Sequence, residues 1–183
     1  SKSMTIRAVA YDIDSIPSPE ADPVSIIVLP TYPLTDTTPG GGTVTFNPPA
    51  GTYLSNTVVT LTASNAPGWT FLRWAGDASG TTPVTTVTMN GGRSVQAIFG
   101  TAIGPSVAAG NGSVSNNPSL SLYPYGSITR LMGLPQAGSF FRYWNGATGS
   151  NTVSPLDFPV TNGNPTITAT FGVLPPPPPP FTP

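Results

Sequence analysis

The chain has 183 residues, which suits one or two small domains with modest hydrophobic cores. It contains six Lys or Arg and seven Asp or Glu residues, and it has neither Cys nor His. This composition excludes disulfides and zinc–thiolate sites, removes the commonest general base, and leaves too few basic groups for a nucleic-acid surface. No apolar run reaches the roughly 18 residues that a membrane-spanning helix needs.

Two apolar segments open the chain, MTIRAVAY (Met4–Tyr11) and VSIIVLP (Val24–Pro30). Both are typical of β-strands, and two strands alone rarely make a stable domain. We therefore expect residues 1–30 to be the end of an immunoglobulin-like domain or to be donor strands. They would pair with the first repeat described below, complete a sheet formed elsewhere, or add to a neighbouring copy. The expected strand-addition residues are Met4, Ile6, Val9, Tyr11, Ile26 and Val28.

Four of the seven acidic residues lie between these two segments: Asp12, Asp14, Glu20 and Asp22. Carboxylates of this kind bind Ca²⁺ in proteins. The spacing, however, is not that of a recognised calcium loop, and a solvated acidic turn is the simpler interpretation. We expect no cofactor and keep Ca²⁺ as the alternative.

The rest of the chain contains an internal repeat at an offset of seventy residues. The shift places Phe71 on Phe141 and Trp74 on Trp144. It grows to seventy-two at the end, where Phe99 matches Phe171. The expected division is a linker at 31–41, β repeat 1 at 42–100, a linker at 101–106, β repeat 2 at 107–172 and a proline-rich tail at 173–183.

Each copy is expected to form five strands and no helix. In the first copy they lie near residues 42–47, 57–63, 69–74, 84–89 and 93–99. Segments such as VVTLTA and SVQAIF alternate apolar and polar residues, and NPPAG, NAPG and NGG supply turns. The sequence thus predicts an all-β fold of two tandem small modules, β-grasp-like or sandwich-like. Two extra strands precede the modules, and a stiff polyproline segment follows them.

Aromatic residues recur at matching positions in the two copies. We interpret eight of them as the repeat core: Tyr53, Phe71, Trp74, Phe99, Tyr123, Phe141, Trp144 and Phe171. Strand alternation would place the Phe and Trp of each pair on opposite faces unless a bulge intervenes. A carbohydrate-stacking surface is the alternative. Its expected ligand-facing aromatic is Trp69, which matches Ser139, and Tyr123 and Tyr125 are further candidates.

The residues offer no catalytic constellation. Asp77 and Asp157 do not correspond under the repeat, so nothing aims them at each other as a hydrolase pair. Lys2 is the only lysine, which excludes Ser–Lys chemistry and a Lys–Asn isopeptide bond within the repeats. We expect no catalytic residues and no enzyme activity.

The pattern G-x-V…P…G-x-Y…V-x-L-x-A…G-x-x-F-x-x-W-x-G…V-x-A-x-F resembles the divergent internalin B-repeat family. In the first copy it is carried by Gly42, Val44, Pro48, Gly51, Tyr53, Val59, Leu61, Ala63, Gly68, Phe71, Trp74, Gly76, Val95, Ala97 and Phe99. The second copy departs from it at Arg130 and Gly133. Residues 1–30 resemble the last strands of a chitobiase/β-hexosaminidase C-terminal type of immunoglobulin-like domain.

The resemblance implies an exported bacterial multidomain protein in which such repeats are spacers without catalytic residues. We therefore expect a non-catalytic structural module at the cell surface or outside the cell: a stalk, a spacer or a filament-forming subunit. The expected partners are other copies of the chain or neighbouring domains of the same protein, with no nucleic acid and no membrane span. A carbohydrate-binding or adhesin accessory module, with a glycan as partner, is the alternative.

Overall fold

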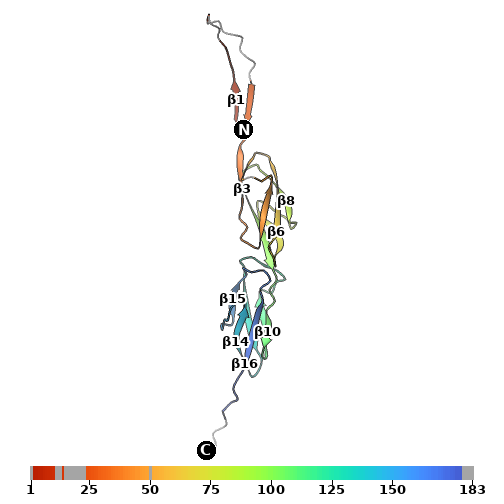
Figure 1. The fold of residues 1–183 in the computed structure, drawn as a ribbon, viewed down its shortest axis with the longest axis vertical. Helices are drawn as coiled ribbons and strands as arrows, with labels where there is room; N and C mark the ends of the chain where they lie inside the picture. Colours follow the sequence, from red (N-terminus) through yellow and green to blue (C-terminus); the bar gives the residue numbers. More distant parts are fainter. Residues whose placement is uncertain (1, 11–13, 15–23, 50, 179–183) are drawn as a thin grey trace, which may run out of the picture.

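The computed structural model describes residues 2–10, 14, 24–49 and 51–178. These residues form strands and turns and contain no helix. Figure 1 shows two modules stacked end to end, with a hairpin projecting beyond the first and the chain leaving the second at the opposite pole. The all-β class and the two tandem modules predicted from the sequence are confirmed.

The first module consists of two small sheets around one core. One sheet has the order β4 (Gly42–Asn47), β6 (Val58–Asn65), β8 (Val84–Thr88), and all its pairs are antiparallel. In the other sheet β9 (Arg93–Thr101) lies between β7 (Thr70–Gly76) and a parallel β3 (Thr31–Asp36), and β5 (Thr52–Leu54) pairs with β3. Alternate residues of β6 and β9 are buried in a shared cluster, so the sheets pack face to face.

The second module repeats this arrangement. One sheet has the order β11 (Gly112–Asn117), β13 (Ile128–Pro135), β15 (Leu156–Pro159). In the other, β16 (Ile167–Val173) lies between β14 (Ser139–Gly146) and a parallel β10 (Ser106–Ala109). The short β12 (Tyr123–Pro124) corresponds to β5 but pairs outside its own module, with β9.

The two copies also share their side-chain hydrogen bonds. Tyr53 donates its hydroxyl to the carbonyl of Pro48 at 2.8 Å, and Tyr123 donates to Pro118 at 2.7 Å. In the same way, the indole N–H of Trp74 donates to Thr82 at 2.9 Å, and that of Trp144 to Val153 at 3.1 Å. Repeated sequence positions therefore make the same contacts, which supports the repeat at the level of structure.

A bulge in β7 places Phe71 and Trp74 on the same face. The pairing with β9 shifts register between Phe71 and Arg73, and β14 shifts at the equivalent place, between Phe141 and Tyr143. One extra residue moves the following side chain to the opposite face of a strand. Both aromatics of each pair can therefore face the core, with ring centroids 5.4 Å apart in the first module and 5.2 Å in the second.

The expected linkers are wrong in part. Residues 31–36 form β3, which hydrogen-bonds to β5 and β9, so this segment is a core strand of the first module and not a spacer. Thr101 and Ser106 close β9 and open β10, which leaves only residues 102–105 between strands. Pairing partners far away in the sequence order these segments, and their Pro-rich and Gly-rich composition does not reveal that.

The first two strands form a hairpin of their own. β1 (Lys2–Ile6) pairs antiparallel with β2 (Val24–Val28), and the two make a separate two-stranded sheet. Among the arrangements expected from the sequence, pairing with the first repeat is therefore wrong. Met4, Ile6, Val9, Ile26 and Val28 are all exposed, and Tyr11 lies outside the described residues.

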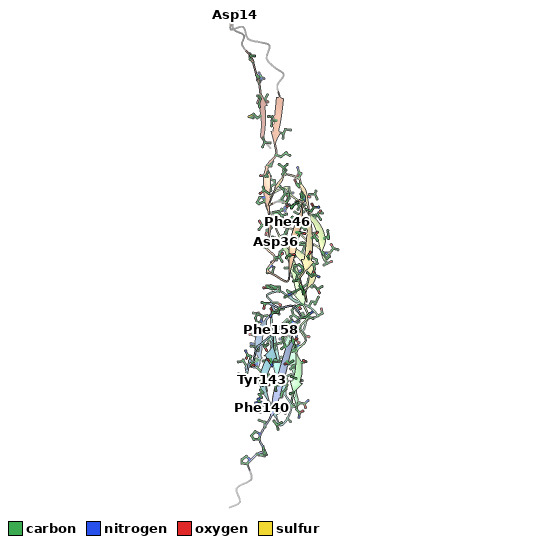
Figure 2. All side chains as sticks on the ribbon, in the orientation of Figure 1. Asp14, Asp36, Phe46, Phe140, Tyr143 and Phe158 are labelled. Atoms are coloured by element: carbon green, nitrogen blue, oxygen red, sulfur yellow. The ribbon has the colours of Figure 1, made fainter. Side chains whose placement is uncertain are left out.

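The C-terminal segment leaves the second module as an exposed chain. Leu174 and residues 175–178 belong to no strand and are exposed, whereas residue 173, where the tail was expected to begin, closes β16. Figure 2 shows the side chains of the two modules gathered around their stacked sheets.

Candidate functional site: the junction between the modules

The last strand of the first module continues into the second. Gly100 and Thr101, at the end of β9, pair with Pro124 and Tyr123 of β12. Next to this pair, the N–H of Tyr125 donates to the carbonyl of Phe99 at 2.9 Å. β12 of the second module therefore extends the sheet of the first module along β9.

Thr101 joins three segments through a single hydroxyl. Its side chain is 1% exposed, donates to the carbonyl of Gly68 at 2.8 Å, and accepts from the N–H of Asn164 at 2.6 Å. Gly68 belongs to the first module and Asn164 to the second. A buried hydroxyl with both partners satisfied fixes the relative position of the two loops.

An aromatic pair closes one side of the junction. The rings of Trp69, from the first module, and Tyr125, from the second, lie 5.3 Å apart between centroids at an angle of 44°. A ring pair at this separation adds about 0.5–1.5 kcal/mol beyond its area burial. Gly40 and Gly41 pass close to these rings, and a Cβ at Gly41 would lie 3.0 Å from the Trp69 ring.

Two glycines bring the loops of the modules into backbone contact. A Cβ on Gly68 would lie 2.8 Å from the carbonyl carbon of Gly163, and one on Gly163 would lie 2.6 Å from the carbonyl oxygen of Pro67. Real Cβ atoms do not approach this closely, so larger residues would push the loops apart. At the junction, main-chain atoms of the two modules are therefore in direct contact.

The aromatics expected to face a ligand are not on the surface. Trp69 is 8% exposed and packs against Tyr125 of the second module, and its match in the second copy, Ser139, is buried to the same extent. Tyr123 is fully buried, and its hydroxyl also accepts from the N–H of Leu120 at 2.9 Å. Tyr125 is partly buried against the core. The expectation of an exposed aromatic platform at these residues is wrong.

The structure places the expected repeat-core residues as follows. Tyr53, Phe71, Trp74, Phe99, Tyr123, Trp144 and Phe171 are buried, and Phe141 is partly buried against the same cluster. Phe141 differs from its counterpart Phe71 because its ring lies over Gly133, where the first module has Ala63. The missing methyl group leaves room for the ring nearer to the strand.

Asp77 and Asp157 each form an ion pair with an arginine. Asp77 accepts from the Arg93 guanidinium at 2.9 Å and from the N–H of Ser94 at 2.7 Å, and Arg130 pairs with Asp157 at 2.9 Å. The hydrogen bond from Ser94, followed by the bond from Arg93, holds the pKa of Asp77 below its ordinary value of 3.8. Each carboxylate is occupied by an arginine of its own module, so the two do not converge on a cleft.

Within the described residues, no group of three or more Asp, Glu, His or Cys side chains could hold a metal ion. Asp12, Glu20 and Asp22 of the candidate calcium loop lie outside the described residues, and Asp14 lies at the tip of the hairpin region. The described part of the chain also has no helix long and apolar enough to cross a membrane.

A model of the divergent InlB B-repeat domain matches residues 32–103 and 106–173. The chain belongs to this family. The first match includes all but the first residue of β3, in agreement with its place in the first module. Neither the curated proteins nor the solved structures gave a match.

Membership places the chain in a repeat family of bacterial surface proteins, whose domains are of a structural or adhesive type and are not known as catalytic. Sequence reasoning found the repeat and its core but missed the junction. One signal in the sequence could have indicated the junction. Trp69 is matched by Ser139, and Thr101 is matched by Val173. Such differences between otherwise similar copies indicate residues with different neighbours.

Proposed function

We propose that the chain is a rigid, non-catalytic spacer that keeps the parts of a bacterial surface protein at a fixed separation and orientation. The observation that carries this proposal is the backbone pairing of β12, from the second module, with β9 of the first. A spacer built this way transmits orientation as well as distance, because turning one module against the other must break backbone hydrogen bonds.

The contacts that cross the junction support rigidity. Domains that move independently are joined by exposed linkers that few contacts cross. Here the crossing contacts include the β9–β12 ladder, the buried hydroxyl of Thr101 and the Trp69–Tyr125 ring pair. Each would be lost on bending, so the straight arrangement is the stable one.

The shape of the molecule also suits a spacer. The hairpin and the proline-rich tail lie at opposite poles, so the length of each module adds to the distance between them (Figure 1). Consecutive prolines favour an extended polyproline II rod without internal hydrogen bonds. The segment from Pro175 would continue the spacer beyond the second module as a semi-rigid element.

Spin-label distance measurements test this proposal, and the absence of native Cys allows unique labels. Cysteines replacing the exposed Thr86 of the first module and Ser150 of the second report the orientation of the modules. We expect a single narrow distance distribution for the parent chain and a broad one after Trp69→Ala combined with Tyr125→Ala.

The exposed Phe140→Ala substitution, which removes an aromatic ring outside the junction, is the matched control and should leave the distribution narrow. A broad distribution in the parent chain would show that the modules move independently and would reject the rigid spacer.

A further inference from the structure

The free end of the second module is an uncovered counterpart of the junction. Its residues Leu134, Phe140, Val173 and Leu174 take the places of Ser64, Thr70, Thr101 and Ala102 of the first module. We call these four residues the distal end. They are 48%, 41%, 77% and 50% exposed, respectively. Of their four counterparts Thr101 is buried at the junction, and Ser64, Thr70 and Ala102 are exposed. Large apolar residues therefore stand exposed where the first module has small or polar ones.

The distal end also has an open sheet edge. Gly172 and Val173 correspond to Gly100 and Thr101, which receive β12 on the side away from β7. In the second module, β10 follows β16 only as far as Thr170, and within the described residues no strand pairs with Gly172 or Val173 on that side. The acceptor position that is filled at the junction is vacant here, and unpaired edges are templates for another strand.

A second uncovered apolar surface lies on the hairpin at the other pole. The register pairs Met4 with Ile26, and alternation puts Ile6 and Val28 on the same face, with Ile27 on the opposite one. Met4, Ile6, Ile26 and Val28 are 55%, 48%, 39% and 56% exposed. We call these four residues the hairpin face. β1 pairs only with β2 in the described chain, so its outer edge is open.

We propose that the hairpin of one copy docks on the distal end of a second copy, with β1 adding to the open edge at Gly172–Val173. The hairpin face would then cover Phe140, Val173 and Leu174. The hairpin and the distal end lie at opposite poles of one elongated molecule (Figure 1), so the hairpin of one copy reaches the distal end of another. The contact also continues the pattern of the junction, in which an incoming strand pairs with the equivalent edge.

The proposed contact joins two different surfaces, so it repeats without closing unless the rotation between copies forms a ring. The expected product is a linear filament held by main-chain hydrogen bonds and apolar side chains, as in strand addition. This association goes beyond the spacer function, which holds equally for a single copy, so the two proposals fail independently.

Sedimentation velocity and negative-stain electron microscopy of the full chain over a concentration series test the proposal. We expect the parent chain to form linear oligomers that lengthen with concentration. Val173→Asp at the distal end, or Met4→Asp with Ile26→Asp on the hairpin face, should weaken association by at least about tenfold, because each buries a charge in the contact. Leu174→Asp tests the same surface beyond β16 if Val173→Asp unfolds the module.

Two matched controls carry the same change elsewhere. Ile27→Asp lies on the opposite face of the hairpin, and Val84→Asp lies on the exposed edge strand β8 of the first module. Both should associate like the parent chain. Equal weakening by these controls would show that the effect is general repulsion and would overturn the proposal.

Mixing the two kinds of disabled chain tests the polarity of the contact. The hairpin variant keeps an intact distal end, and the Val173→Asp variant keeps an intact hairpin. Their mixture should therefore form one-to-one dimers that do not grow. A mixture that stays monomeric, or a parent chain that stays monomeric up to about 1 mM, would overturn the proposal and leave another polypeptide as the occupant of the hairpin face.

Discussion

The two modules share one frame but differ in their surroundings. Trp69 and Thr101 of the first module pack against the second, whereas Val173, the counterpart of Thr101, is 77% exposed. Trp74 and Trp144 in the interior, in contrast, are the same residue and make the same type of hydrogen bond. Comparison of the two copies therefore distinguishes residues that the fold itself requires from residues that the contact with a neighbouring module requires.

A second difference lies inside the core. Ala63 of the first module is replaced by Gly133, and the ring of Phe141 occupies the space that a methyl group would take. Phe71 is 9% exposed, while Phe141 is more accessible. The two cores are thus filled differently: a methyl group on the strand fills the space in the first module, and the phenylalanine ring fills it in the second.

The largest expected effect tests the shared frame. Trp74→Ala and Trp144→Ala should each destabilise their own module by about 3–5 kcal/mol, because both indoles are buried and a cavity is left behind. Denaturant unfolding followed by circular dichroism measures this loss. Phe140→Ala, at an exposed ring, should cost far less. Clearly different losses for the two tryptophans would show that the modules do not share an equivalent core.

The next effect tests the difference at the ends. Thr101→Val should destabilise the chain by about 2–4 kcal/mol, because the Gly68 carbonyl and the Asn164 N–H lose their buried partner together. Val173→Thr is the matched change at the exposed end and should stay within about 0.5 kcal/mol. Equal effects, measured by denaturant unfolding, would mean that the junction does not depend on this hydroxyl.

The third effect tests the core difference. Gly133→Ala should cost about 1–3 kcal/mol, since the added methyl group overlaps the Phe141 ring and forces it to move. The reverse change, Ala63→Gly, should cost about 1–2 kcal/mol through lost burial and greater freedom of the unfolded chain. Thermal unfolding of both variants measures the pair. A stabilising Gly133→Ala would show that the ring has room to retreat.

A smaller effect measures the aromatic link between the modules. A double-mutant cycle of Trp69→Ala and Tyr125→Ala should give a coupling of about 0.5–1.5 kcal/mol, as expected for two rings at this separation. The cycle is measured by denaturant unfolding of the four proteins. A coupling near zero would mean that the rings are neighbours without stabilising the junction.

Local patterns were enough to predict the strands that alternate strictly. The strand expected at residues 42–47 coincides with β4, and those around Leu61 and Ala97 lie within β6 and β9. β3, β5, β10 and β12 were missed because each is short and is held by pairing with a segment distant in the sequence. The composition of such segments does not indicate a strand, because they become strands through hydrogen bonds to the strands that they pair with.

The candidate site could not be predicted, for a related physical reason. Thr101 lies in a segment that looks like a linker, and its importance comes from Gly68 and Asn164, which only the stacked modules bring together. Trp69 was interpreted as exposed because its match is Ser139. The same observation, interpreted as a difference of neighbours, identifies the junction. The bulge places Phe71 and Trp74 on the same face of β7. From the sequence, a bulge was only the named exception to strand alternation and was not itself predicted.

The smallest expected effect concerns acid and rests on Asp77 of the first module. Asp77 accepts hydrogen bonds from Ser94 and Arg93, whereas the second module has Ala147 and Pro165 in place of the ion pair. Because folding lowers the pKa of Asp77, its contribution to stability is present above the ordinary pKa of 3.8 and is lost as the pH falls through the lower folded value.

Asp77→Asn should therefore destabilise the first module at neutral pH and make its unfolding midpoint less sensitive to pH below about 4. The second module should unfold alike in both proteins, which makes it an internal control within the same chain. Tryptophan fluorescence in a background of Trp69→Phe and Trp144→Phe follows the first module through Trp74, since Trp69 packs against the second module. An unchanged acid response in Asp77→Asn would mean that this carboxylate does not anchor the turn, and that the absence of the pair from the second module has no consequence for stability.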